Sequence, residues 1–318
     1  MSRLASCACI LALAAACQAQ AVAAASTTAS GGSGGGSGNL HRRGLLESGV
    51  QAAIVNGKPT VYGRYPYIVS LRRNGIHFCG GTLILPRLVL TAAHCLYESN
   101  GKRSAATYWY PKVRIGGHSR DGGGYEQRRG MRTVVHPRYN PKSEENDVAL
   151  VLLNLPSKKP TIKLPSARPS PAAVPGTMLT AIGWGDLRDG GPSAKVLQEA
   201  PLMLLNTRTC SVYMPDERWG RNSMMCAGEP SKKRDTCTGD SGGPLFKKDA
   251  RGRPWRDVQV GIISFGYACA GWRPGVYTNV AMVAPWIRKT AAALLLVPPR
   301  RGLLSAGAEQ SANAKRLG

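Results

Sequence analysis

The sequence predicts an all-β protein, either a barrel or a sandwich, with one helix near the C-terminal end. From Ile54 onward, short runs rich in Val, Ile, Leu and Tyr are separated by Gly, Pro and Asn, as is typical of strands joined by turns. The helix is expected to have Pro285 in its first turn and to end at Leu296, before Pro298 and Pro299. The clearest predicted strands are 67–71, 82–85, 148–153, 258–264 and 276–280.

The N-terminal segment 1–23 has the features of a secretory signal peptide. Arg3 precedes the apolar run 10–16, which is shorter than the roughly 20 residues that a membrane-spanning helix needs, and small residues follow it. A secreted, extracellular and soluble protein is therefore expected. Modification of Cys17, as in a bacterial lipoprotein, is an alternative, although the alanines before it match that signal poorly.

Changes in composition divide the rest of the chain. Residues 24–53 are rich in Gly and Ser and are expected to be a flexible propeptide and linker. Residues 54–290 should form the folded domain, and residues 291–318 the end of the helix and a flexible basic tail. Six of the nine cysteines lie after the predicted signal peptide, and an even number in an exported chain indicates disulfides, although spacing alone does not choose the pairs.

The chain is strongly basic. Its formal net charge is +24, and only three bases and one acid precede Ile54, so the expected mature chain keeps a charge of +22. Such a field favours binding to anionic polysaccharide, nucleic acid or acidic membrane surfaces, in a way that weakens with salt. The alternative is that the charge serves solubility and reflects a bias toward Ala, Gly and Arg.

A serine flanked by glycines is the sharpest candidate for a nucleophile. Ser241 lies in the segment 239–244, Gly-Asp-Ser-Gly-Gly-Pro, where the glycines allow a tight turn and a close approach of backbone amides to a substrate. The segment also fits the Gly-x-Ser-x-Gly motif of α/β-hydrolases, in which the acid and the histidine follow the serine. Here no histidine follows His136, so the base for Ser241 must precede it in the chain.

One histidine and one aspartate have the context that a nucleophilic serine requires. His94 ends an apolar run and precedes Cys95, so that a disulfide there would help to hold the imidazole in place as a general base. Asp147 precedes the apolar run 148–153, where a carboxylate is costly to bury unless an imidazole N–H pairs with it. Structural roles are expected for the other histidines of the domain, His77, His118 and His136.

Six segments in order make the chain from Ile54 to about Thr290 resemble the chymotrypsin/trypsin family of serine proteases. The resemblance implies two six-stranded antiparallel β-barrels, with the active site between them, and a C-terminal helix. His94 and Asp147 would belong to the first barrel and Ser241 to the second. The segments that carry the resemblance are 54–57, 91–95, 147–150, 183–185, 239–244 and 274–277.

The resemblance also implies the chemistry. Ser241 would attack the scissile carbonyl, His94 would take and return the proton, and Asp147 would orient His94. The backbone N–H groups of Gly239 and Ser241 would form the oxyanion hole. Protein or peptide substrates, a monomer, and no cofactor or metal are expected. The implied disulfides are Cys79–Cys95, Cys210–Cys226 and Cys237–Cys269.

Specificity is predicted from Asp235, six residues before Ser241, where trypsin-like members have a carboxylate at the floor of the specificity pocket. The resemblance places Gly266 and Gly275 in the walls, which leaves room for a long side chain, and the buried carboxylate would select Arg or Lys. The alternative is that Asp235 is a solvated loop acid beside the bases 232–234. The other expected wall residues are Thr236, Ser264 and Phe265.

Two positions depart from the family pattern near the substrate and the calcium loop. Phe265 stands where a tryptophan is usual beside the substrate backbone, which should reshape the next subsite without abolishing catalysis. The segment 116–120 begins the loop that binds calcium in some members, but Glu126 is nearly the only acid in register, so calcium binding is not expected.

Activation is expected to depend on Ile54. The resemblance implies that its freed α-amino group pairs with Asp240, so that the uncleaved precursor is nearly inactive. Ala53 precedes the cut, where self-activating members have a basic residue, so a separate activating protease that accepts small residues is expected, with or without a first cut at the pair 42–43.

A secreted, trypsin-like serine endopeptidase made as a zymogen is therefore predicted. One alternative is a catalytically idle, cationic binding protein on the same fold, although no member of the triad is missing. The other alternative is a serine protease of different specificity, which would follow if Asp235 were displaced from the pocket.

Overall fold

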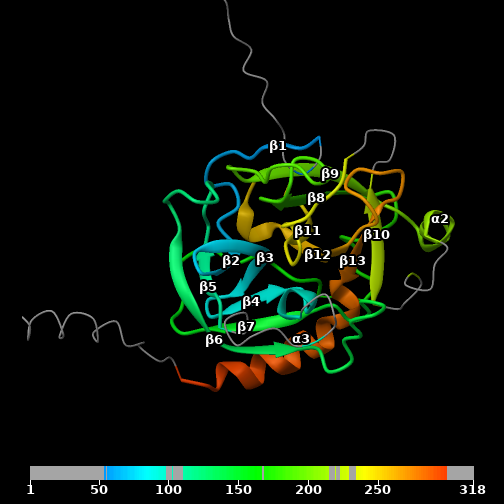
Figure 1. Cartoon of the computed structure of the whole chain (residues 1–318). Helices are drawn as coiled ribbons and strands as arrows, with labels where there is room; N and C mark the ends of the chain where they lie inside the picture. The colour runs from blue at the N-terminus through cyan, green and yellow to red at the C-terminus, as the bar shows by residue number, and fades with distance from the viewer. Residues whose placement is uncertain are drawn as a thin grey trace, which may run out of the picture. The chain divides into compact units, whose positions relative to one another are not determined.

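The computed structural model contains thirteen strands and two α-helices in the part of the chain that it describes (Figure 1). The described residues are 54, 56–97, 102, 110–166, 168–214, 219, 223–228 and 234–298. The predicted signal peptide, the linker 24–53 and the tail beyond Pro298 lie outside these residues. No helix in the described ranges is both long and apolar enough to cross a bilayer.

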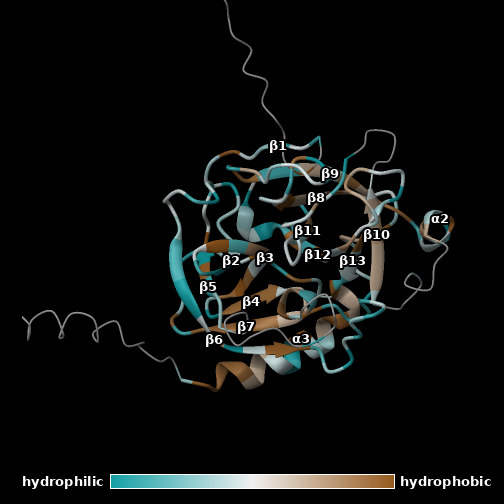
Figure 2. Ribbon diagram, in the orientation of Figure 1, coloured by the Kyte–Doolittle hydropathy of each residue, from teal (hydrophilic) through white to brown (hydrophobic). Residues whose placement is uncertain are grey.

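The first barrel is closed by six antiparallel strands in the order β2-β3-β4-β7-β6-β5. β4 and β7 pair with Val89 opposite Val151, both are buried along their whole length, and both are strongly hydrophobic in Figure 2. The hairpin from β2 to β3 turns at Asn74 and Gly75, whose φ angles of 50° and 83° suit an Asn-Gly turn. The strands are β2 (Ile68–Arg73), β3 (Ile76–Leu85), β4 (Leu88–Thr91), β5 (Lys112–Ile115), β6 (Glu126–Val135) and β7 (Ala149–Leu153).

The second barrel has six strands in the order β8-β9-β10-β13-β12-β11, closed by pairing of β11 with β8. The short strand β1 (Lys58–Pro59) adds to the edge of β9. The predicted pair of six-stranded antiparallel barrels is therefore confirmed. The strands are β8 (Met178–Gly183), β9 (Gln198–Leu204), β10 (Met224–Gly228), β11 (Pro244–Lys247), β12 (Val258–Phe265) and β13 (Gly275–Asn279).

A charge pair with a fully buried carboxylate joins the two barrels. Arg64, shortly before β2, donates two hydrogen bonds of 2.7 and 2.9 Å to the carboxylate of Asp257, just before β12. The hydroxyl of Tyr67 donates a third bond of 2.6 Å to the same carboxylate, which is fully buried. Because bidentate, charge-assisted bonds have a defined geometry, this contact fixes the orientation of one barrel against the other.

The C-terminal helix α3 (Val280–Leu295) begins earlier than the sequence predicts. The side chain of Asn279 caps it by accepting a hydrogen bond of 3.1 Å from the backbone N–H of Ala281. Pro285 is therefore inside the helix rather than in its first turn, and Val280, predicted as the end of a strand, is its first residue. These two predictions were wrong because the helix starts at the cap that Asn279 provides and continues through Pro285. The other helical segments are α2 (Thr207–Tyr213) and the 3₁₀ turns 94–96 and 254–256.

Candidate active site

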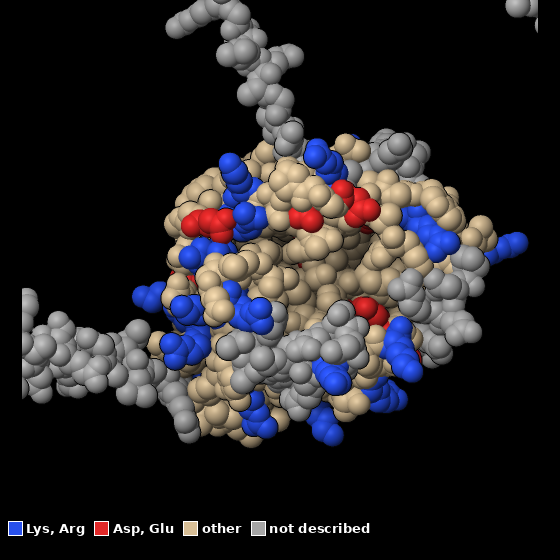
Figure 3. Space-filling model, viewed as in Figure 1, with Lys and Arg blue, Asp and Glu red and all other residues tan. Residues whose placement is uncertain are grey.

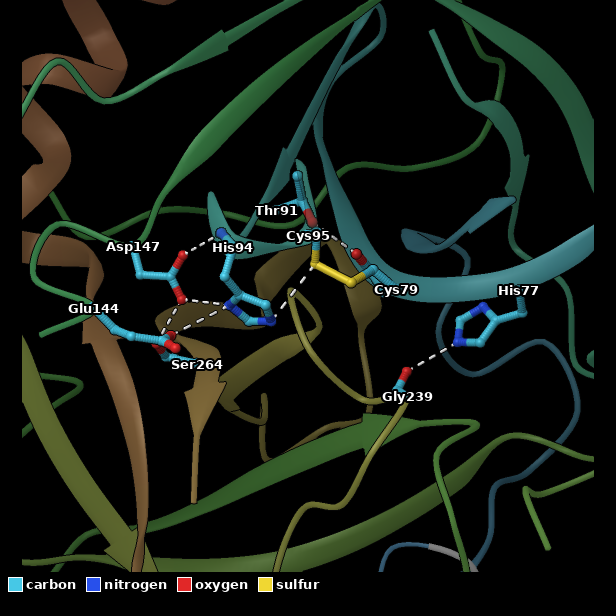
Figure 4. The surroundings of a disulfide bond; sticks show 10 residues. His77, Cys79, Thr91, His94, Cys95, Glu144, Asp147, Gly239 and Ser264 are labelled. Atoms are coloured by element: carbon cyan, nitrogen blue, oxygen red, sulfur yellow. Dashed lines mark hydrogen bonds and ion pairs between the residues drawn. A yellow bond between two sulfur atoms is a disulfide. The ribbon is translucent and has the colours of Figure 1, made fainter. Parts of the chain in front are cut away.

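His94 and Asp147 form a paired unit at the ends of β4 and β7 (Figure 4). The His94 ring donates from Nδ1 to Oδ2 of Asp147 at 2.7 Å, and the backbone N–H of His94 donates to Oδ1 at 2.8 Å. Since a fully buried carboxylate accepts at Nδ1, that nitrogen bears the proton in the neutral ring and Nε2, which lies 3.9 Å from Sγ of Cys95, has the lone pair. This tautomer is the one that a general base needs.

The second barrel also holds Asp147. Ser264, on β12, donates to Oδ2 of Asp147 at 2.5 Å, and Thr278, on β13, donates to its backbone carbonyl at 2.8 Å. From the sequence, Ser264 was expected only in the pocket wall, and nothing in its local context signals this bond. One hydroxyl of the second barrel thus bonds the buried carboxylate of Asp147, and another bonds its backbone.

The charges at this site shift the pKa values of both partners. Burial by itself lowers the pKa of His94, but the charge of Asp147, its hydrogen bond and the charge of Glu144 outweigh burial and raise that pKa to about 9. Burial likewise raises the pKa of Asp147, and the charge and hydrogen bonds of His94 overcome it, so the net shift is downward. The ionised acid therefore strongly favours an imidazolium, the form that the histidine takes on accepting a proton.

Ser241 lies in a loop that packs against the segment leading to His94. Its carbonyl accepts a bond of 2.7 Å from the backbone N–H of Gly80, and any Cβ on Gly242 would overlap the hydroxyl of Thr91. Across the described residues, the Ser241 hydroxyl makes no hydrogen bond to the His94 ring. Such bonds are often long in the absence of substrate and shorten when the reacting complex forms.

The loop contains two backbone N–H groups, those of Gly239 and Ser241, that were expected to form the oxyanion hole. Gly239 has a φ of 95°, which favours glycine, and its carbonyl accepts a bond of 2.9 Å from Nε2 of His77. Ser70 donates to Nδ1 of the same ring at 2.8 Å, and burial lowers the pKa of His77 to about 4, so the ring is neutral. Neither Gly239 nor Ser241 donates its N–H to another described residue, which leaves both donors for an oxyanion.

A cavity of about 260 Å³ adjoins Ser241. Figure 3 shows a hollow in this face of the molecule, with acidic side chains at its rim. Asp235 and Gly275 are not among the residues that line this cavity, whereas the other expected wall residues are. The lining includes Thr236, Ser264, Phe265 and Gly266.

Asp235 lies immediately behind that lining. A Cβ on Gly275 would come within 2.8 Å of its Oδ1, and one on Gly266 within 3.9 Å of its Oδ2, so the carboxylate lies between the two glycines. Only 3% of Asp235 is exposed, so the alternative of a solvated loop acid is wrong. Burial raises the pKa of Asp235 to about 7, although the N–H groups of Thr236 and Ala270 oppose this shift.

Asp240 is buried next to Ser241 without a cationic side chain against it in the described ranges. Its carboxylate accepts bonds from the N–H groups of Gly185 at 2.8 Å and Cys237 at 2.9 Å, and burial raises its pKa to about 7. Ile54 is fully buried in the second barrel. Its nitrogen is in a peptide bond in the uncleaved chain, so the expected ion pair with Asp240 is not formed here.

Three disulfides occur in the described ranges, two of them at the site, and they join the pairs that the family resemblance implies. Cys79–Cys95 links β3 to the 3₁₀ turn that contains His94, and Cys237–Cys269 lies at the cavity. Cys210–Cys226 links α2 to β10.

One group of side chains at the site has the residue types of a metal site. In the described ranges, His94, Glu144 and Asp147 have ligand atoms within 4.8 Å of one another. The 2.7 Å contact between His94 Nδ1 and Asp147 Oδ2 is a hydrogen bond, so this nitrogen bears a proton and has no lone pair to offer an ion. The other two candidate groups contain disulfide-bonded cysteines.

Comparison with known proteins identifies relatives of the folded region. Residues 54–287 match the family model for Trypsin. The chain is 32% identical over 244 residues to the suppressor of tumorigenicity 14 protein homolog of Bos taurus, which covers 75% of this chain and 28% of that protein. It is 34% identical over 249 residues to mannan-binding lectin serine protease 1 of Mus musculus, which covers 74% of this chain and 35% of that protein. The chain thus spans about a third of the length of these relatives.

Proposed function

Because the chain belongs to the trypsin family of serine proteases, we propose that it is a secreted endopeptidase that cleaves peptide bonds after Arg or Lys. The observation that carries the specificity is the position of Asp235, buried between Gly266 and Gly275 behind the cavity that adjoins Ser241. A guanidinium or ammonium group entering that cavity would supply the counter-charge that a buried carboxylate requires.

The proposed reaction uses Ser241, His94 and Asp147. The Ser241 hydroxyl attacks the scissile carbonyl while His94 Nε2 takes its proton, and the imidazolium is stabilised by Asp147. The negative charge that forms on the carbonyl oxygen is held by the N–H groups of Gly239 and Ser241. His94 then gives its proton to the leaving amine as the C–N bond breaks, which leaves Ser241 acylated. Water next attacks the acyl carbon while His94 takes its proton, and His94 returns that proton to Ser241 as the acid product leaves.

The enzyme would be made as an inactive precursor. Asp240 is fully buried with only backbone donors against its carboxylate, so a free α-amino group at Ile54 would complete a buried ion pair. Cleavage before Ile54 is assigned to a separate protease, because Ala53 does not match the specificity proposed for Asp235.

A basic surface on the first barrel supports a second kind of partner. Lys112 on β5 lies directly opposite Arg129 on β6, both are exposed, and Arg132 is exposed further along β6. Like charges that face each other across strands are unfavourable without a counter-charge. With Lys and Arg at the periphery of the face in Figure 3, this β5–β6 basic surface, made of Lys112, Arg129 and Arg132, favours an anionic polysaccharide as a partner.

The test of the proposed function is active-site labelling followed by a substrate profile. Full chain cleaved before Ile54 should react with an organophosphorus serine reagent and hydrolyse amide substrates with Arg or Lys before the cut. Ser241→Ala should abolish labelling and lower hydrolysis by several orders of magnitude. Ser193→Ala is the control, since this serine bonds Asp186 at 2.6 Å outside the reacting groups. A cleaved wild-type chain that neither labels nor hydrolyses would support the idle binding protein, and labelling with a different side-chain preference would support the other specificity.

A further inference from the structure

The loop between β6 and β7 contains an acidic side chain that the proposed mechanism does not use. Oε2 of Glu144 is 3.6 Å from Nδ1 of His94 and 3.5 Å from Oγ of Ser264 (Figure 4). The side chain is 24% exposed, so part of it is open to solvent. A second, partly exposed carboxylate therefore lies beside the His94–Asp147 pair.

The backbone of this loop is strained at the residue that bears this carboxylate. Glu144 has a φ of 59°, in the left-handed region, and Asn146 has a φ of 56°. Asn adopts this conformation readily, but Glu rarely does. The strained turn is held by a bond of 2.7 Å from the N–H of Glu144 to the carbonyl of Asn140. An unfavourable conformation kept next to reacting groups indicates a function for the side chain that it positions.

The path of a substrate past Glu144 follows from the proposed function, on which this inference rests. The side chain of the Arg or Lys immediately before the scissile bond enters the cavity, whose lining belongs to the second barrel. In an extended peptide, successive side chains point to opposite sides. The preceding side chain therefore points away from the cavity, toward the first barrel, where His94 and Glu144 lie.

The surroundings of Glu144 suit a long cationic side chain. The rings of Tyr97 and Tyr139 pack edge to face with centroids 5.1 Å apart. Burial raises the pKa of Tyr139, and the nearby charges of Asp147 and Glu144 raise it further. An aromatic surface beside a carboxylate can hold the stem and the charge of Arg or Lys together.

We propose that Glu144 selects a basic residue immediately before the Arg or Lys that is held by Asp235, so that the substrates are chain segments with paired basic residues. A carboxylate that is partly exposed should give a preference of about 3- to 10-fold over a neutral residue of similar length, because the pairing is partly screened by solvent. The chain itself has such a pair at Arg42 and Arg43, ahead of the expected activation site.

The experiment compares peptide amides that end in X-Arg, with X as Arg, Lys, Gln or Leu, on full chain cleaved before Ile54. Wild type should cleave the Arg-Arg and Lys-Arg substrates about 3- to 10-fold faster than Gln-Arg, in kcat/KM, and the ratio should fall as salt rises. Glu144→Gln should bring the ratio close to one. Glu145→Gln, a change of the neighbouring acid, which lines a different cavity, should leave it unchanged.

Because the ratio is taken within each variant, a general effect of Glu144 on His94 cancels. An Arg-Arg to Gln-Arg ratio near one in wild type, or the same high ratio in Glu144→Gln, would overturn the proposal while leaving specificity for Arg and Lys intact. If no X-Arg substrate is cleaved but substrates with another final residue are, the failure lies instead in the role given to Asp235.

Discussion

Ser264 of the second barrel donates a hydrogen bond of 2.5 Å to Asp147 of the first, so one barrel positions the acid that pairs with His94 in the other. We therefore expect Ser264→Ala to lower kcat/KM by about 10- to 100-fold, the range for losing a bond to a buried charge. The measurement is steady-state hydrolysis of an Arg amide. Thr278→Val, which removes only a bond to the backbone of Asp147, is the control and should cost less. Activity equal to wild type in Ser264→Ala would show that Asp147 needs no support from the second barrel.

Replacing Asp235 by Ser should separate specificity from reactivity. Without the carboxylate between Gly266 and Gly275, the charge of a bound Arg has no buried partner, and kcat/KM for Arg and Lys substrates should fall at least about 100-fold. Labelling of Ser241 by the organophosphorus reagent should persist, because Asp235 is not among the reacting groups. Asp186→Asn is a control that removes a different acid. An unchanged preference for Arg in Asp235→Ser would mean that the pocket is elsewhere.

Activity should rise with pH. His94 must be neutral to take the proton of Ser241, and its pKa is raised to about 9, so kcat/KM should increase as pH rises through that pKa and then level off. Glu144→Gln removes one of the charges that raise this pKa, so the curve should shift to lower pH. A series of kcat/KM values from about pH 5 to about pH 10 checks both expectations. A curve that declines with rising pH across this range would contradict the role of His94 as the base.

Self-activation should be absent in the wild-type chain and appear in Ala53→Arg. An enzyme that selects Arg or Lys through Asp235 does not cleave after Ala53, but it does cleave after an introduced arginine. The check is to mix purified precursor with a trace of active enzyme and to sequence the new N-termini. Rapid release of an Ile54 terminus from the wild-type chain would contradict both the separate activating protease and the basic specificity.

The β5–β6 basic surface should bind heparin-like polymers at low salt and release them as salt increases. Screening at about 0.15 M shortens the reach of exposed charges to about 8 Å, so retention on the polymer should depend steeply on salt. The double variant Lys112→Gln, Arg129→Gln should elute at lower salt than wild type. Arg288→Gln, Lys289→Gln removes two exposed bases of α3 and is the matched control. Equal elution of the two double variants would show that the total charge, and not this surface, is responsible.

Much of the fold was predictable from local pattern. Strand runs such as 148–153 alternate with turn residues, and their burial follows from their composition alone. The start of α3 was not predictable from local pattern, because Asn279 can cap a helix or end a strand. The pairing of β13 with β12 decides between these roles.

The sequence by itself determined the chemical types and their order: a serine between glycines, an earlier histidine beside a cysteine, an acid before a buried strand, and an acid six residues ahead of the serine. These are local features, and local sequence encodes them. Tertiary structure alone decided that Ser264 and Asp147 share a hydrogen bond, that His77 holds the carbonyl of Gly239, and that Glu144 faces His94. Each of these contacts joins residues that are at least 50 positions apart in the chain. Their formation depends on how two closed barrels dock, which no short stretch of sequence specifies.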